Sequence, residues 1–244
     1  MSKVIVKDVP GWPRFCNMLI KNIVTTLLAE KFNLKVVEYA HEEKCNKLGI
    51  NLFSGNSNYK KIYKLNDTNF LEIYSRDKIN FNICTGGHFF QTNEISKLIY
   101  KKLRGENKKN IIDNNKFKER YQNNKDIFIH IRLGDKKNDN PGLDYYLKVI
   151  NEIKNYENIY IGSDSPEDNL IKKLIEIKNA KVILYDDIET IQFASTCKYI
   201  ILSHGTYSYF IGVLGFFSEV FYPDYKRVPL WCGDIFTNMG WKNI

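Results

Sequence analysis

Between residues 127 and 222, short apolar segments typical of strands alternate with segments whose apolar residues recur at helical spacing. A strand followed by a helix and a second strand is the repeating unit of a parallel sheet that helices cover. We therefore predict a doubly wound α/β domain in this part of the chain. The expected strands are 127–131, 159–162, 182–185, 199–202 and 219–222, and the expected helices are 144–153, 188–195, 206–214 and one that opens at 165.

A similar alternation occupies the N-terminal half. Strands are predicted at 4–6 and 35–38, with a long helix between them that extends to Phe32, and another helix at 93–104. Shorter strands are predicted at 59–65 and 70–74. Because residues 105–125 are polar and rich in Asn and Lys, we interpret them as a link between two halves. We expect a first domain over 1–115, a second over 116–225, and a tail over 226–244 that packs back on the first.

The composition and charge of the chain narrow the classes of molecule that it could bind. Its net charge of +8 and pI of about 9.0 favour anionic partners without choosing among nucleic acid, membrane surfaces and phosphorylated small molecules. The five cysteines are scattered and form no CxxC pair, so we expect reduced thiols rather than a disulfide framework or a zinc site. With neither a signal-peptide pattern nor a long apolar run in the sequence, we predict a cytoplasmic protein without an integral membrane segment.

Three predicted strands of the second half end in polar residues. The first end is His130-Ile131-Arg132-Leu133-Gly134-Asp135, the second is Ser163-Asp164, and the third is His204-Gly205-Thr206-Tyr207-Ser208. Ligands of open α/β sheets bind at the carboxyl ends of strands. Helix N-termini attract phosphate, and an arginine can hold phosphate oxygens through two donors. Together these features predict a nucleotide-diphosphate pocket.

Each feature also has a purely structural explanation. Arg132 and Asp135 could form a salt bridge across a turn, and His130 could be a core histidine. In the segment Ser165-Pro166-Glu167-Asp168, Ser165 is predicted to cap a helix whose capping box Asp168 closes. We favour a site because the three strand ends belong to one sheet edge. The absence of GxxxxGK[ST] and of GxGxxG after a strand disfavours an NTPase or a dinucleotide enzyme.

Several segments, in order, resemble motifs of the α-1,2-fucosyltransferases of glycosyltransferase family 11. "HIRLGD" resembles the family's "HxRRGD", "GGHFFQTNEI" its "GYFQSEKYF", and "IYIGSDSPED" its "FSDDPEW". The opening "GWPRFCNML" resembles a glycine-rich loop and helix, and "CKYIILSHGTYSYF" resembles "CKHNIIANSTFSWW". The chain departs from the family at Leu133, where a second arginine is usual, and at His204-Gly205, where the family has Asn-Ser.

The resemblance implies a GT-B fold, in which two Rossmann-like domains with mainly parallel sheets face a cleft. It implies an inverting, metal-independent transfer of L-fucose from GDP-fucose to a hydroxyl of a glycan acceptor, without a cofactor. Arg132, with His130, would stabilise the leaving diphosphate, and Asp135 would brace Arg132. The residues expected to contact the donor are Gly11, Arg14, Ser163, Asp164, His204, Gly205, Thr206, Tyr207 and Ser208.

The catalytic base stays open among Asp8, His88, Asp135 and Asp144, and so do the acceptor and the oligomeric state. Two other functions stay open as well. The first is a GT-B glycosyltransferase with another nucleotide-sugar donor. The second is a basic nucleic-acid-binding protein, suggested by the net charge and the lysines of 101–125.

Overall fold

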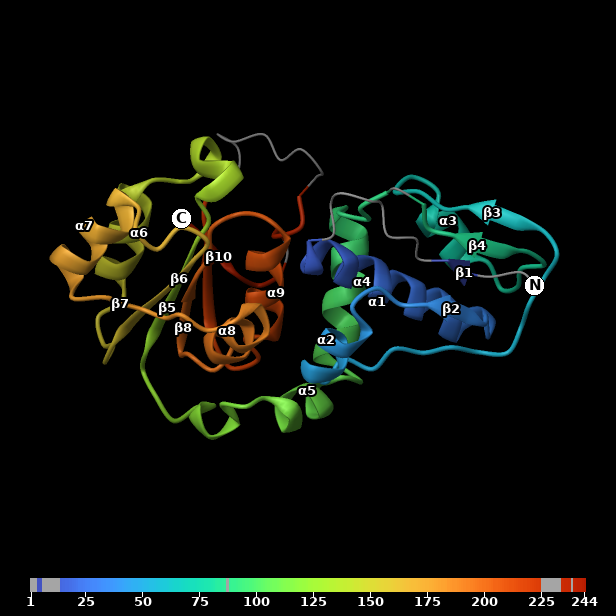
Figure 1. Cartoon of the computed structure of the whole chain (residues 1–244), viewed down its shortest axis with the longest axis horizontal. Coiled ribbons are helices and arrows are strands. Elements are labelled where there is room, and N and C mark those ends of the chain that lie inside the picture. Colours follow the sequence, from blue (N-terminus) through green and yellow to red (C-terminus); the bar gives the residue numbers. More distant parts are fainter. Residues whose placement is uncertain (1–3, 6–13, 87, 225–233, 238) are drawn as a thin grey trace. The chain divides into compact units, whose positions relative to one another are not determined.

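The computed structural model describes residues 4–5, 14–86, 88–224, 234–237 and 239–244 (Figure 1). These residues form two compact units. The first unit extends to Lys102 and includes Asp234 and Ile235. The second unit begins at Leu103 and includes Phe236 and the residues that follow it.

The second unit is built on a parallel sheet. Its described strands are β5 (Ile127–Ile131), β6 (Ile159–Ser163), β7 (Lys181–Val182), β8 (Tyr199–Ile201), β9 (Glu219–Tyr222) and β10 (Lys242–Asn243). Their spatial order is β7-β6-β5-β8-β9-β10, and each neighbouring pair is parallel. The chain thus builds outward from β5 in one direction and then from β8 in the other, which is the order of Rossmann-type sheets. The predicted α/β class with parallel strands is confirmed.

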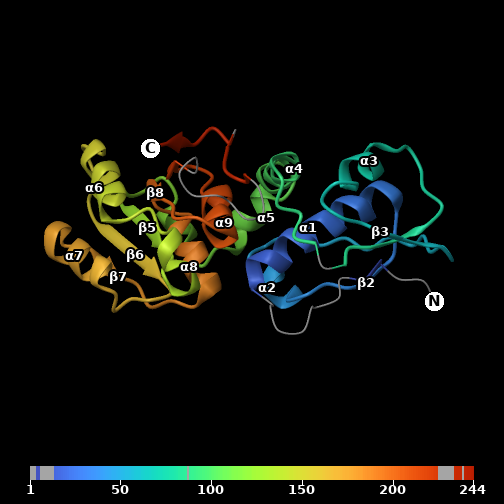
Figure 2. The same cartoon turned by 90° about the horizontal axis from the view of Figure 1, so that it is seen from above.

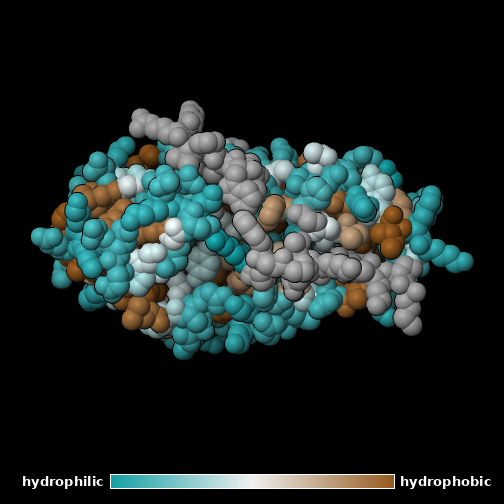
Figure 3. All heavy atoms as spheres, turned by 45° about the horizontal axis from the view of Figure 1, so that its top comes forward, coloured by the Kyte–Doolittle hydropathy of each residue, from teal (hydrophilic) through white to brown (hydrophobic). Residues whose placement is uncertain are grey.

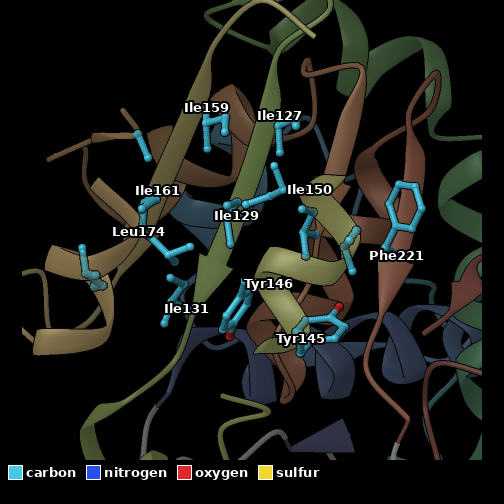
Figure 4. Packing of buried hydrophobic residues seen from close by; sticks show 14 of the residues in the cluster. Ile127, Ile129, Ile131, Tyr145, Tyr146, Ile150, Ile159, Ile161, Leu174 and Phe221 are labelled. Carbon is cyan, nitrogen blue, oxygen red and sulfur yellow. The ribbon is translucent and has the colours of Figure 1, made fainter. Parts of the chain in front are cut away.

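Helices cover both faces of this sheet. The side chains of β5 alternate in direction, so neighbouring residues of this strand pack against helices on opposite faces. Ile127, Ile129 and Ile131 pack in one cluster with apolar residues of α6 (Leu143–Glu152) and α7 (Asn169–Lys178) (Figure 4). His130, between them in the sequence, contacts α9 (Thr206–Leu214) instead. Helices α6 and α7 lie on one side of the strands, and α8 (Asp187–Ala194) and α9 on the other (Figures 1 and 2).

The first unit contains a smaller parallel sheet in the order β2-β1-β4-β3. Its strands are β1 (Val4–Ile5), β2 (Val36–Glu38), β3 (Ile62–Lys64) and β4 (Asn82–Cys84). Its helices are α1 (Phe15–Phe32), α2 (Glu42–Lys47), α3 (Phe70–Ser75) and α4 (Asn93–Arg104), of which α4 runs past the boundary between the units. The predicted strands at 4–6 and 35–38 and the predicted helix up to Phe32 correspond to β1, β2 and α1.

The strand predicted at 70–74 is wrong, because this segment is helix α3. The Asn66 side chain accepts hydrogen bonds from the backbone N–H groups of Thr68 and Asn69, at 3.0 and 2.8 Å, and so turns the chain into the helix. Phe70 and Ile73 are both fully buried. Their spacing of three residues places both on one helical face.

The predicted cap of α7 is also displaced. Helix α7 begins at Asn169, and its N-cap is Asp168, whose carboxylate accepts from Leu170 N at 2.9 Å. Ser165 lies outside the helix, and its backbone N–H donates to Ser163 Oγ at 3.1 Å. Asp168 also forms an ion pair of 2.6 Å with Lys137.

The polar stretch 105–125 contains α5 (Lys108–Asn114) and the short 3-10 helix η1 (Lys118–Arg120), and it belongs to the second unit. Asn115 Nδ2 donates to Gln192 O at 2.9 Å, and Gln192 Nε2 donates to Asn114 O at 3.1 Å. Arg120 forms a 2.7 Å ion pair with Asp126 and lies over the ring of Phe193. The boundary between the compact units therefore falls near residue 102 rather than at 115.

Of the expected tail, residues 226–233 and 238 lie outside the described residues. Asp234 and Ile235 belong to the first unit, whereas Phe236, Thr237 and residues 239–244 belong to the second, where β10 pairs with β9 and extends the sheet. The rings of Phe236 and Trp241 contact Tyr209 of α9, at centroid distances of 6.4 and 6.2 Å. A free sheet edge and a cluster of aromatic side chains thus hold this segment against the second unit.

Hydrophilic residues cover most of the face displayed in Figure 3, and hydrophobic residues appear there in separate patches. Among the described helices, none combines the length and the apolar character that a membrane crossing requires.

Candidate functional site

The predicted site residues of the second unit gather where the strand order reverses. This reversal lies between β5 and β8, which are neighbours in the sheet but not in the sequence. A crevice at the carboxyl ends of such a strand pair is the usual ligand position in open α/β sheets. Arg132 and Leu133 follow β5, and His204 and Gly205 follow β8.

Arg132 bridges the two strand ends. A Cβ atom built on Gly205 would lie 2.5 Å from Arg132 Nη1, so the guanidinium lies directly against this glycine. The other terminal nitrogen, Nη2, donates to Asp135 Oδ1 at 3.1 Å. The Arg132 side chain is 16% exposed and that of Asp135 is 45% exposed. The expected salt bridge therefore forms, and it leaves Nη1 directed at the segment that starts α9.

Gly205 is the N-cap residue of α9 and has φ +94° and ψ 168°. Only glycine adopts this backbone conformation without strain. As a glycine, the N-cap residue has no side-chain oxygen of its own to cap the helix. A helix N-terminus beside a guanidinium is a favourable position for an anion.

Asp164 fixes the loop that carries Arg132, and its contact with the donor stays a prediction. Its Oδ1 accepts from the backbone N–H groups of Leu133 and Gly134, at 2.9 and 3.3 Å. A Cβ atom on Gly134 would lie 2.7 Å from Asp164 Oδ2, so the carboxylate fits only against a glycine. Ser163, the last residue of β6, accepts from Ser165 N and likewise shapes a turn.

His130 is 6% exposed and contacts helix α9 rather than solvent. Its Nδ1 lies 2.5 Å from Ser208 Oγ, and Ser208 is fully buried. The pKa of His130 is lowered to about 4, mainly by burial; Asp164 acts in the opposite direction, and His204 contributes to the lowering. At neutral pH the ring is uncharged and cannot add positive charge beside Arg132. This geometry gives His130 the role of positioning α9.

Thr206 and Tyr207 form the first turn of α9. Thr206 is buried, whereas Tyr207 is partly exposed. The Tyr207 hydroxyl donates to Asp187 O at 2.7 Å, and its ring lies 5.1 Å from that of His130. Tyr207 thereby joins the start of α9 to the start of α8.

The remaining predicted residues belong to the first unit. Arg14 is exposed and is the N-cap residue of α1. His88, one of the candidate bases, lies beyond β4 with Nδ1 3.3 Å from Asp67 Oδ2. Gly11 and the candidate base Asp8 lie outside the described residues.

A cavity of about 560 Å³ adjoins the strand ends, and the sequence analysis identified only two of its polar residues, His204 and Asp144. It missed Asn140, whose Nδ2 donates to Arg132 O at 2.9 Å and to Tyr146 Oη at 3.1 Å. The turn signal Asn140-Pro141-Gly142 before α6 could have pointed to it. The cavity is lined by Asp139, Asn140, Pro141, Asp144, Tyr145, Lys148, His204, Pro223, Asp224 and Ile244.

No group of three or more His, Cys, Asp or Glu side chains is arranged to hold a metal ion in the part of the chain that the structure describes.

Comparison of the chain with protein-family models, with curated proteins and with solved structures finds no match.

Proposed function

We propose that this chain is a glycosyltransferase that takes a sugar from a nucleotide-sugar donor and transfers it to a hydroxyl of a glycan acceptor. One observation carries the proposal: the Arg132 guanidinium lies against Gly205, the N-cap residue of α9, at the reversal of the strand order. The ordered likeness of the sequence to α-1,2-fucosyltransferases selects GDP-fucose as the donor, and a GT-B arrangement of two domains as the framework.

On this proposal, Arg132 and the first N–H groups of α9 hold the diphosphate. As the bond between the sugar and the diphosphate breaks, negative charge grows on the leaving oxygen, and a fixed cation there stabilises the transition state. Asp164 and Asn140 keep the Arg132 loop in place through its backbone. The acceptor hydroxyl attacks the opposite face of the sugar, with inversion and without a resident metal, and loses its proton to a base that we leave unassigned.

We expect GDP and GDP-fucose to raise the melting temperature more than uridine nucleotides do. A ligand at 100 times its dissociation constant adds about 2.7 kcal/mol to stability. For a chain of this size that corresponds to a shift of about 5–10 °C. A thermal-shift titration with guanine and uridine nucleotides measures this. A shift with uridine nucleotides alone would move the proposal to another donor, and no shift with any nucleotide would contradict it.

Gly205→Ala should lower both stability and nucleotide affinity, whereas Gly142→Ala should lower stability alone. Both glycines are N-cap residues with nearly the same backbone, at φ +94° and +86°. The strain of a side chain there costs roughly 1–3 kcal/mol. Only at Gly205 would the new Cβ meet Arg132, because nothing lies within 4 Å of a Cβ at Gly142. Urea unfolding and GDP titration of both variants test this, and equal GDP affinities would argue against a diphosphate at Arg132.

The nucleic-acid alternative depends on the lysines of 101–125, and several of these already have partners. Lys102 pairs with Glu30 at 2.6 Å, Lys109 pairs with Asp113, and Lys116 pairs with Glu189 at 2.5 Å. Paired lysines contribute less to phosphate binding than a patch without counter-charges would. We therefore favour the small-molecule site.

A further inference from the structure

The cavity of about 560 Å³ beside the strand ends has the size of a small-molecule site, for which about 300–1,000 Å³ is typical. Its walls come from residues 139–141 before α6, from α6 itself, from His204 in the loop after β8, from the two residues after β9 and from Ile244 after β10. It therefore lies on the β8–β9 side of the strand-order reversal. Asn140 belongs both to this wall and to the support of Arg132, so the cavity adjoins the proposed diphosphate position.

His204 supplies a hydrogen-bonding atom that the protein leaves unused. The residue is 7% exposed, and its Nε2 is buried without a partner among the described residues. Burial lowers the pKa of His204, although the Asp139 carboxylate and a hydrogen bond with the Asp139 backbone raise it. In the neutral tautomer that carries its proton on Nδ1, Nε2 is an acceptor, and a buried acceptor without a donor is costly.

The charges of the lining residues that the structure describes disfavour a second phosphate site. Among them, Asp139, Asp144 and Asp224 contribute three carboxylates, and Lys148 contributes one ammonium group. Carboxylate oxygens and the neutral Nε2 accept hydrogen bonds, so the ligand must present many donors and no negative charge. Pro141, Pro223 and Ile244 add apolar wall, against which C–H groups can pack. A pyranose ring combines several hydroxyl groups with apolar C–H faces.

We propose that this cavity is a saccharide subsite, in which a hydroxyl group of one neutral pyranose ring donates to His204 Nε2. In its link to catalysis the subsite rests on the proposed function, because a ring here would be either the sugar of the donor or a residue of the acceptor. The cavity places that ring beside Arg132, where the sugar separates from the diphosphate.

Two substitutions at position 204 test the contact itself. His204→Asn keeps a donor near the position of Nδ1 and removes Nε2, whereas His204→Gln places an amide near Nε2. Isothermal titration of the full chain with GDP, GDP-fucose and free L-fucose compares them. We expect His204→Asn to weaken saccharide binding about tenfold, His204→Gln to recover part of it, and GDP affinity to stay within twofold.

The titrations also identify the source of the ring. If it belongs to the donor, GDP-fucose binds more tightly than GDP and His204→Asn removes that advantage. If it belongs to the acceptor, GDP-fucose keeps its higher affinity over GDP in His204→Asn. The same variant then binds a panel of free monosaccharides more weakly than the natural chain does. Should no nucleotide bind while free monosaccharides bind in a His204-dependent way, the transferase proposal fails and the subsite stands.

A second position keeps the test informative if a variant at position 204 does not fold. Asp144 lies in the first turn of α6 and is exposed, so Asp144→Asn should fold, and it should weaken the same saccharide probes about threefold or more. Asp113→Asn, at an exposed carboxylate paired with Lys109, is the matched control. Folded variants at 144 and 204 that bind every probe as the natural chain does would overturn the proposal.

Discussion

Arg132→Ala should reduce turnover of the nucleotide sugar about 100-fold or more, because the variant loses the cation that stabilises the leaving diphosphate. The melting temperature should fall by no more than about 2–4 °C. The pair that Arg132 forms with Asp135 is partly exposed, at 3.1 Å, and such pairs contribute about 0–1 kcal/mol. Arg132→Lys should also lose most activity, because an ammonium group does not reproduce the planar fork of donors. Turnover and melting temperature are measured on the same samples.

Two further variants separate a binding role from a structural one. Asp135→Ala removes the same salt bridge and leaves the guanidinium in place, so it should retain far more activity than Arg132→Ala. Arg76→Ala breaks an exposed arginine pair with Glu72, at 2.7 Å, and controls for the loss of a surface cation. If Arg132→Ala and Asp135→Ala lower stability alike, and turnover falls only with the folded fraction, Arg132 is structural and the proposed function loses its main support.

Seven elements of the second unit, β5, α6, β6, α8, β8, α9 and β9, lie within one residue of their predicted bounds. The strand predicted at 182–185 is displaced, because β7 spans Lys181–Val182, and α5 and β10 were not predicted. In β5, alternate isoleucines face α6 and α7, while His130 faces α9. The two-residue period of the side chains therefore corresponds to the two faces of a sheet that helices cover on both sides. Where elements are short, local side-chain hydrogen bonds override periodicity. Asn66 turns an apolar segment into α3, and Asp168 rather than Ser165 caps α7.

The candidate site could be located from the sequence, but the role of each residue could not. The rule that ligands bind at carboxyl ends of strands brought Arg132 and Gly205 together correctly. That Asp164 holds the backbone of Leu133 and Gly134 depends on distances between two strands, which spacing along the chain does not contain. The same limit applies to the cavity, whose walls come from residues between 139 and 244.

His130 illustrates how burial changes a predicted role. The sequence placed it beside Arg132 as an aid to phosphate binding, which assumes a charge. In the structure the ring is enclosed between β5 and α9, and its pKa falls to about 4. On the proposed function, positive charge at the diphosphate is then left to Arg132, and we expect the histidine to make the stability of the chain depend on pH.

Stability should fall as the pH is lowered from about 6.5 toward 4, and His130 should account for part of that fall. The unfolded chain binds a proton at His130 near pH 6.5, whereas the folded chain resists it until about pH 4. Between these values the unfolded state holds more protons, so unfolding becomes easier as the pH decreases. The difference of about 2.5 pKa units corresponds to roughly 3 kcal/mol at the acidic limit.

Urea unfolding between pH 4 and 7 measures this contribution as the difference between the natural chain and His130→Gln. Carboxylates titrate in the same range in both proteins, so only the difference in slope reports His130. The variant should lose stability at pH 7, because Gln fits the contact with Ser208 less well, and should then depend on pH less steeply. His88→Gln, at an exposed ring in the first unit, controls for removal of a histidine as such. Parallel curves for the natural chain and His130→Gln would mean that His130 accepts its proton in the folded state as readily as in the unfolded one, and a charged histidine would then stand beside Arg132 after all.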